Sequence, residues 1–88
     1  MNGNIHDPRD LVIEHDHPAE IEEKAVEILT EYRGWERGKS PSGCAAGAVY
    51  ISYKMNTDYQ APTQRVIAEQ YGCSPVTIRN RIREFEVM

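Results

Sequence analysis

Residues 40–55 read SPSGCAAGAVYISYKM, and this stretch decides how the rest of the chain can fold. Ser40 can cap a helix with its hydroxyl and Pro41 suits the first helical position, so the sequence predicts a helix from Ser40 to Met55. The side chains that follow are apolar or small on every side. A surface helix carries a single apolar stripe, so this pattern indicates a central helix with neighbours packed all around it.

Small residues dominate the first half of this helix. Six of them run from Gly43 to Ala48, and short side chains let neighbouring helices approach closely. A glycine inside a helix costs about 1 kcal/mol relative to alanine, so we expect close packing to offset the cost of Gly43 and Gly47. The apolar run is shorter than the roughly 20 residues of a membrane span, and Lys39 and Lys54 bound it, so a transmembrane helix is not expected.

The length and composition fit one small intracellular domain. The chain has 88 residues, of which 40% are hydrophobic, and such a fraction is ordinary for a folded protein. The first residues, MNGNIHDPRD, lack the basic start and apolar run of a secretory signal. Cys44 and Cys73 make no CxxC pair, so we expect neither a disulfide nor structural zinc, and we interpret Cys44 as a small buried apolar residue.

The net charge of −4 is unevenly distributed along the chain. Residues 1–38 carry −6, whereas residues 39–62 and residues 63–88 each carry +1. The overall field would slow the approach of nucleic acid. The C-terminal third nevertheless holds four arginines, and a local basic face there could still bind DNA.

We treat residues 1–17 as an N-terminal tail, since they are polar and irregular apart from an apolar island at Leu11, Val12 and Ile13. The island fits a flexible tail, a fragment of helix, or a short strand that pairs with another chain. We do not choose among these three alternatives.

Histidines and aspartates gather in the same segment. His15 and His17 flank Asp16, and His6 and Asp7 lie shortly before them. These residue types can bind a divalent metal, but their spacing matches no defined site. We therefore predict no metal site and no cofactor.

Residues 18–88 form the predicted domain. Its first helix runs from Pro18 to about Tyr32, with Asp16 or His17 as the cap. The apolar stripe of this helix comprises Ile21, Ala25, Ile28, Leu29 and Tyr32, and glutamates occupy the other side. Trp35, in the turn that follows, is expected in the core or as a lid over it.

Two shorter helices complete the domain. Thr63 caps a helix from Gln64 to about Tyr71, and Ser74 caps a last helix from Pro75 to about Phe85. In the first of these, the expected buried residues are Val66, Ile67 and Tyr71, with Ala68 close to a neighbouring helix.

Residues 63–86 have the pattern of a helix-turn-helix. Ala68 and Gly72 allow a close crossing and a tight turn, and Ile78 follows at the right distance to close the small core. On the last helix, Ile78 shares one side with Ile82 and Phe85. The nearly opposite side carries Val76, Arg79, Asn80 and Arg83.

Those residue types suit the reading of base edges in the major groove: arginine binds guanine, asparagine binds adenine, and a small apolar group contacts the thymine methyl. We predict that Val76, Arg79, Asn80 and Arg83 read bases. We expect phosphate contacts from Gln64, Arg65, Arg81 and Lys39. The alternative is an ordinary amphipathic helix with a solvated arginine face.

Two long motifs, GKSPSGCAAGAVYISYKM and TQRVIAEQYGCSPVTIRNRIREF, resemble the C-terminal cyclin repeat of transcription factor IIB, most closely its archaeal form, TFB. The equivalent family stretches read close to GKSPxGLAAAALYIA and TQRxIAExxGVTxVTIRNRYKEL. The resemblance covers about Glu20 to Phe85. It implies an all-α, cyclin-like helical bundle that ends in a helix-turn-helix, in an archaeal, cytoplasmic, nucleoid-associated protein. In the family, a valine and an arginine of the VTIR motif contact the element that flanks the TATA box, and these fall on Val76 and Arg79.

The sequence departs from the family in two respects. The sequence lacks the ribbon cysteines, the linker that enters RNA polymerase, and a second repeat. We therefore expect no polymerase recruitment of the kind that the full factor performs. Most of the first repeat helix is also missing, since only Leu11 to Ile13 could replace it, which leaves about four helices. The central helix would then be exposed along one side, and exposed apolar surface marks interfaces. We therefore predict a homodimer or docking onto another cyclin-repeat protein.

Two functions remain open at this point. The first is a transcription regulator that binds double-stranded DNA, and the motif RNRIR favours it. The second is a protein-interaction module that docks on the TATA-binding protein, TFB or another regulator, and the acidic N-terminal helix favours it. We do not expect an enzyme, because no paired carboxylates, activated nucleophile or glycine-rich phosphate loop stand out.

Overall fold

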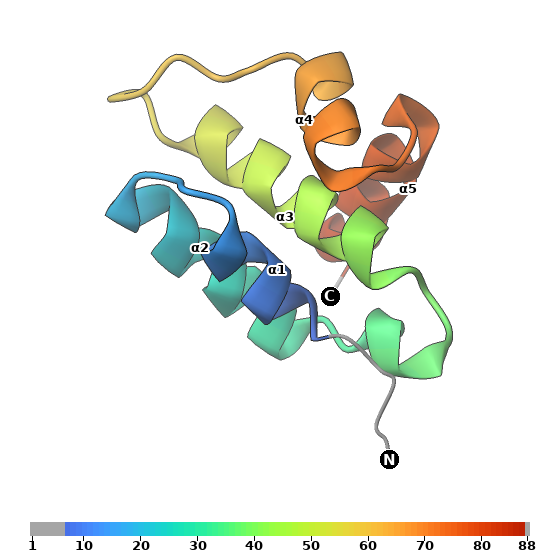
Figure 1. The fold of residues 1–88 in the computed structure, drawn as a ribbon. Coiled ribbons are helices and arrows are strands. Elements are labelled where there is room, and N and C mark those ends of the chain that lie inside the picture. Colours follow the sequence, from blue (N-terminus) through green and yellow to red (C-terminus); the bar gives the residue numbers. More distant parts are fainter. Residues whose placement is uncertain (1–6, 88) are drawn as a thin grey trace.

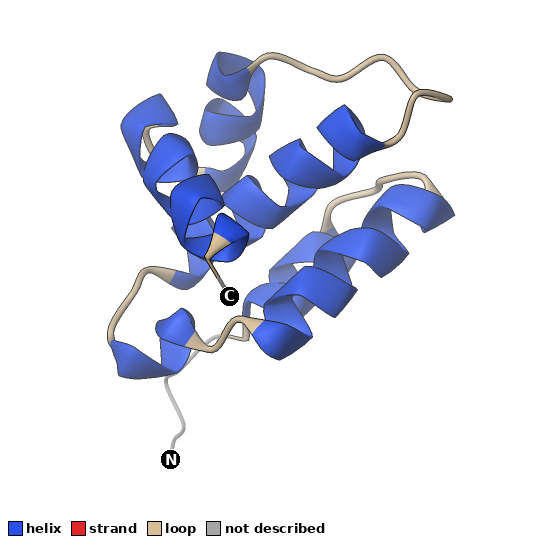
Figure 2. Ribbon diagram, turned by 180° about the vertical axis from the view of Figure 1, so that it is seen from behind, coloured by secondary structure: helices blue, strands red, loops and turns tan. Residues whose placement is uncertain are grey.

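A computed structural model describes residues 7–87, which contain helices and no strand (Figures 1 and 2). The elements are α1 (Pro8–Glu14), α2 (Ala19–Glu31), the 3-10 helix η1 (Gly34–Arg37), α3 (Pro41–Met55), α4 (Gln64–Tyr71) and α5 (Pro75–Glu86). Helix α3 lies in the middle, with α1 and α2 on one side and α4 and α5 on the other (Figure 1). The predicted all-α helical bundle is confirmed.

Helix α3 is central, as the sequence predicted. The Ser40 hydroxyl accepts a hydrogen bond from the Gly43 amide at 3.4 Å, and Pro41 occupies the first turn. The buried run is continuous from Gly43 to Val49. Ser52, one turn further, is also buried, and its hydroxyl donates to the Ala48 carbonyl at 2.6 Å. A buried hydroxyl needs such a partner, so the polar group is compatible with the core.

The glycines of α3 allow α5 to pack closely. A Cβ atom at Gly43 would lie 2.5 Å from the Thr77 methyl, and one at Gly47 would lie 2.8 Å from the Arg81 Cβ. Both distances are far shorter than ordinary van der Waals contact, so only glycine permits this approach. The close packing that we expected to offset the cost of two glycines is therefore a contact between α3 and α5.

Helix α2 packs against α3 through the predicted stripe, because Ile21, Ala25, Ile28 and Leu29 are buried. Trp35, in η1, is buried as expected, and its indole nitrogen donates to the Tyr32 carbonyl at 3.1 Å. The predicted cap of α2 is wrong. The capping position belongs to Pro18, which makes no side-chain hydrogen bond there.

Residues 8–14 form a helix within the predicted N-terminal tail. Asp7 caps α1 by accepting a hydrogen bond from the Arg9 amide at 2.9 Å, and Val12 is fully buried. Helix α1 packs against both α2 and α3. Of the three alternatives for the apolar island, the structure shows a helix, and this helix belongs to the bundle.

The packing of α1 also removes the reason given for a homodimer. That reason required α3 to be exposed along one side, but α1 covers α3, and Gly43 to Val49 are buried in the monomer. The homodimer stays a prediction without this support. Among residues 7–87, no helix is long and apolar enough to cross a bilayer.

Candidate nucleic-acid interface

Helices α4 and α5 and the three-residue turn between them form a structural unit that we call the α4–α5 unit (residues 63–86). Thr63 caps α4 by accepting a hydrogen bond from the Val66 amide at 3.2 Å. Gly72 ends α4 in the left-handed conformation, with φ 71°, and the Cys73 amide donates to the Ala68 carbonyl at 2.9 Å. Ser74 then caps α5 by accepting from the Thr77 amide at 3.2 Å. The turn residues thus set the direction of α5.

The buried side of the unit differs from the prediction at one residue. Ile67, Ala68 and Tyr71 are buried as expected, but Val66 is 52% exposed. On α5, Ile78 is fully buried.

The exposed side of α5 carries the four residues predicted to read bases. Val76 is 54% exposed, and Arg79, Asn80 and Arg83 are exposed as well. The structure thus leaves a valine, two arginines and an asparagine on the solvent side of α5 while the opposite side packs on α3. An exposed valine between cations is an unfavourable surface in water, but it suits contact with a thymine methyl.

Two residues of α4 border this surface. Arg79 donates a hydrogen bond from Nη1 to Gln64 Oε1 at 3.1 Å, which links the start of α4 to the middle of α5. Arg65 is exposed beside Gln64. Gln64 thus lies beside an arginine of α5, as a phosphate-contacting role requires.

The other two residues expected to contact phosphate are placed differently. Arg81 is only 9% exposed, and its Nη2 donates to Glu84 Oε2 at 3.2 Å. This burial argues against the predicted phosphate contact, because the guanidinium packs inside the bundle with its carboxylate partner. Lys39 is exposed, but its Nζ lies 3.5 Å from Glu84 Oε2. Glu84 is itself about 12 Å along the α5 axis from Val76, so Lys39 lies far from the first base-reading residue.

Glu84 connects three elements around Arg81. Its carboxylate accepts a hydrogen bond from the Tyr32 hydroxyl, which is the main cause that lowers the Glu84 pKa. Burial and the same hydrogen bond raise the pKa of Tyr32. Burial also raises the pKa of the nearby Cys44 thiol to about 11, so this thiol stays protonated near neutral pH. These contacts connect the end of α2, at Tyr32, to α5.

The histidines considered for metal binding also have structural partners. His17 lies 3.2 Å from the Tyr53 hydroxyl through Nδ1 and 2.8 Å from the Tyr71 hydroxyl through Nε2. His15 lies 3.1 Å from the Gln70 carbonyl. Within residues 7–87 no group of three or more side chains is arranged to hold a metal ion, and His6 lies outside the described residues.

The class defined by this architecture is an all-α bundle consistent with a cyclin-like fold. No family model matches the chain. Curated relatives named transcription initiation factor IIB do match it: one from Methanococcus maripaludis is 42% identical over 76% of this chain, and one from Methanocaldococcus jannaschii is 42% identical over the same share. A third, from Methanoregula boonei, is 43% identical over 74% of this chain.

Over the region matched, the chain is thus homologous to archaeal transcription initiation factor IIB. It spans 20% of the length of the M. maripaludis and M. boonei relatives and 10% of the M. jannaschii relative. The match thus corresponds to one repeat of these larger proteins.

Proposed function

We propose that the protein acts in transcription initiation or its regulation by binding double-stranded DNA through the α4–α5 unit. In this proposal the unit is a helix-turn-helix and α5 enters the major groove. Val76, Arg79, Asn80 and Arg83 contact base edges, and Gln64 and Arg65 contact phosphates. One observation carries the proposal: the four residues of α5 are exposed on one side, Gln64 is bonded to Arg79 among them, and the opposite side of α5 packs against α3.

Lys39 has a secondary place in this proposal. It lies beyond the base-reading residues and is paired with Glu84, so it would reach only phosphates at the edge of the site. Arg81 has no place in it, since its guanidinium is buried. The homology to transcription initiation factor IIB supports the TATA-binding protein as a further component of the complex.

The test is a fluorescence-anisotropy titration of two labelled duplexes, one of random sequence and one carrying a TATA box with its flanking element. Wild type, Arg79→Ala, Arg65→Ala and the control Lys54→Ala are compared over a series of salt concentrations, with and without the TATA-binding protein. Lys54 is exposed at the end of α3, away from the α4–α5 unit.

A base-reading role for Arg79 predicts that its alanine variant loses sequence preference by about 1 to 3 kcal/mol. A phosphate role for Arg65 predicts weaker binding to both duplexes and a salt slope reduced by about one. Lys54→Ala should bind like wild type. Equal losses on both duplexes for Arg79→Ala would exclude base reading. No binding at low salt would leave the protein-interaction module as the function, which the acidic N-terminal region favours.

A further inference from the structure

An apolar groove of about 350 Å³ lies between α2, α3 and α5. Its apolar lining comes from three separate helices: Ile28 of α2, Ile51 and Met55 of α3, and Ile82 and Phe85 of α5. Ile51, Ile82 and Phe85 are only partly buried, and Met55 is 58% exposed. Apolar side chains from three elements thus face one solvent-open depression, which is an arrangement typical of binding grooves.

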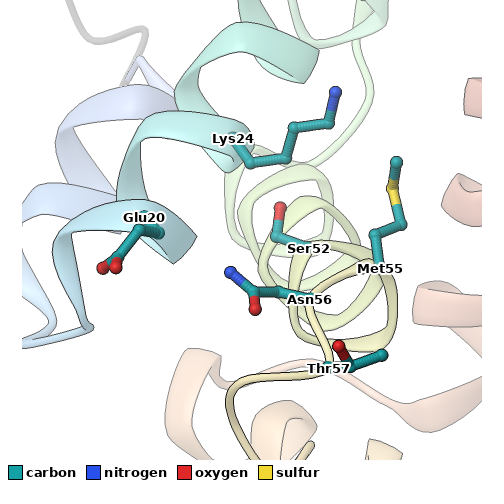
Figure 3. A pocket seen from close by; sticks show the side chains of 6 residues that line it. All are labelled: Glu20, Lys24, Ser52, Met55, Asn56 and Thr57. Carbon is teal, nitrogen blue, oxygen red and sulfur yellow. The ribbon is translucent and has the colours of Figure 1, made fainter.

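The groove continues along α2 beyond these residues. A second depression, of about 320 Å³, shares Lys24 and Met55 with it and extends between α2 and the end of α3. In Figure 3, Lys24 of α2 extends above Ser52 of α3, whereas the Glu20 side chain points away from α3. From Glu20 to Glu31 the α2 wall is about 16 Å long, which matches about three turns of a docked helix.

The rim of the groove is acidic. Glu27 and Glu31 of α2 and Glu86 of α5 line it, and all three are exposed. Lys24 is the basic residue among those lining it, and its ammonium is already paired with Glu27 at 2.9 Å. The rim therefore keeps an excess of negative charge, in a region where residues 1–38 carry −6. Such a field disfavours nucleic acid and attracts cationic groups.

We propose that this acidic groove (Glu27, Ile28, Glu31, Ile51, Met55, Ile82, Phe85 and Glu86) binds an amphipathic helix of a partner protein that bears lysines or arginines along the sides of its apolar stripe. The apolar stripe would cover the floor of the groove, and the basic flanks would pair with Glu27, Glu31 and Glu86. Charge complementarity identifies this partner, because an acidic or nucleic-acid ligand would be repelled by the rim.

The groove and the candidate DNA-binding surface meet along one edge of α5. At 100° per residue, Phe85 and Val76 point in opposite directions, but Ile82 and Glu86 lie within about 60° of Arg79. The acidic rim at Glu86 therefore adjoins the basic surface at Arg79. This inference does not depend on the proposed function, because it concerns side chains outside the DNA-binding surface.

The experiment titrates the full chain into two labelled synthetic helical peptides of about four turns. One has leucines along a single stripe with lysines flanking it, and in the other glutamates replace the lysines. We expect saturable binding of the lysine peptide, weakened by salt, and no binding of the glutamate peptide. Methyl NMR shifts should be confined to Ile28, Ile51, Met55 and Ile82.

Variants distinguish binding in this groove from general attraction of the peptide to an acidic protein. Glu27→Gln combined with Glu31→Gln should weaken binding of the lysine peptide about tenfold. Glu22→Gln, on the other side of α2, should leave it within about twofold. Met55→Ala removes an exposed apolar contact without disturbing the core, and it should weaken binding at least about threefold. Circular dichroism melts verify that each variant is folded.

Three results would overturn the proposal: equal binding of both peptides, an equal loss for Glu22→Gln and the double variant, or methyl shifts that map elsewhere. Shifts of the groove methyls that grow with protein concentration in the absence of peptide would assign the groove to a second copy of the chain instead. Loss of DNA binding in Arg79→Ala with peptide binding intact would show that the two functions are separable.

Discussion

Gly43 shows at the level of one residue how α3 and α5 are held together. The nearest atom to a Cβ placed there is the Thr77 methyl, at 2.5 Å, whereas the Thr77 Cβ is 3.9 Å away. The obstacle is thus a single methyl group. Since the Thr77 hydroxyl lies 3.1 Å from the Ser74 hydroxyl, replacement of Thr77 by serine removes the methyl and can keep that polar contact.

We therefore predict that Gly43→Ala destabilises the protein by up to about 2 kcal/mol, since overpacking costs about 1–3 kcal/mol and alanine regains about 1 kcal/mol of helix propensity. Thr77→Ser alone should also destabilise, because it removes a packed methyl. In Gly43→Ala/Thr77→Ser, however, the second change should restore stability. Urea denaturation of the four proteins measures this coupling, and additive losses would contradict it.

His17 makes the fold sensitive to pH. Burial is the largest cause that lowers the His17 pKa below its ordinary value of 6.5, followed by the charge of His15. The neutral ring is bound between the hydroxyls of Tyr53 and Tyr71. The folded state therefore takes up a proton at lower pH than the unfolded state does.

It follows that the free energy of unfolding should fall as the pH decreases below about 6.5, because the unfolded chain binds the proton first. Urea denaturation at pH 7.5 and pH 5.5 should show lower stability at the acidic value. The difference should shrink in His17→Gln, which does not titrate. If the variant keeps the whole difference, other groups cause it.

Among the elements, the turn between α4 and α5 depends on backbone conformation alone. Gly72 has φ 71°, and nothing lies within 4 Å of the position that a Cβ would occupy. Any cost of substitution at Gly72 thus comes from the left-handed conformation rather than from a clash. This turn orients α5 and hence its exposed residues.

We predict that Gly72→Ala lowers stability by about 1 kcal/mol, whereas Gly72→Asn loses less because asparagine tolerates this conformation better. Thermal unfolding monitored by circular dichroism compares the two variants. Equal losses for alanine and asparagine would contradict a conformational cause. The DNA affinity of both should follow the fraction of folded protein.

At the scale of the whole molecule, α1 determines whether the bundle is complete. Val12 of α1 is fully buried, whereas the adjacent Ile13 is 56% exposed. Val12→Ala should destabilise the protein by about 2 kcal/mol through lost burial and a cavity, and Ile13→Ala by less than about 0.5 kcal/mol. Urea denaturation of the two variants measures both losses of stability. Similar small effects for both would mean that α1 is not part of the cooperative unit.

Local patterns in the sequence were sufficient to predict most of the helices of the fold. Ser40, Thr63 and Ser74 identified three helix starts, since a capping hydroxyl acts on its own first turn. The run of small residues identified the central helix. The two sides of α5 followed from helical geometry, so the exposure of Val76 and Arg79 could also be predicted.

The sequence by itself thus determined α2 to α5 in order, the central place of α3 and the residues that α5 exposes. Only the tertiary structure showed that α1 completes the bundle, that Val66 is exposed, that Arg81 is buried with Glu84, and that an acidic groove joins α2, α3 and α5. The physical reason is the separation in sequence over which each interaction acts. Caps and periodicity act within one or two turns, whereas the burial of a side chain depends on neighbours that are distant in the sequence.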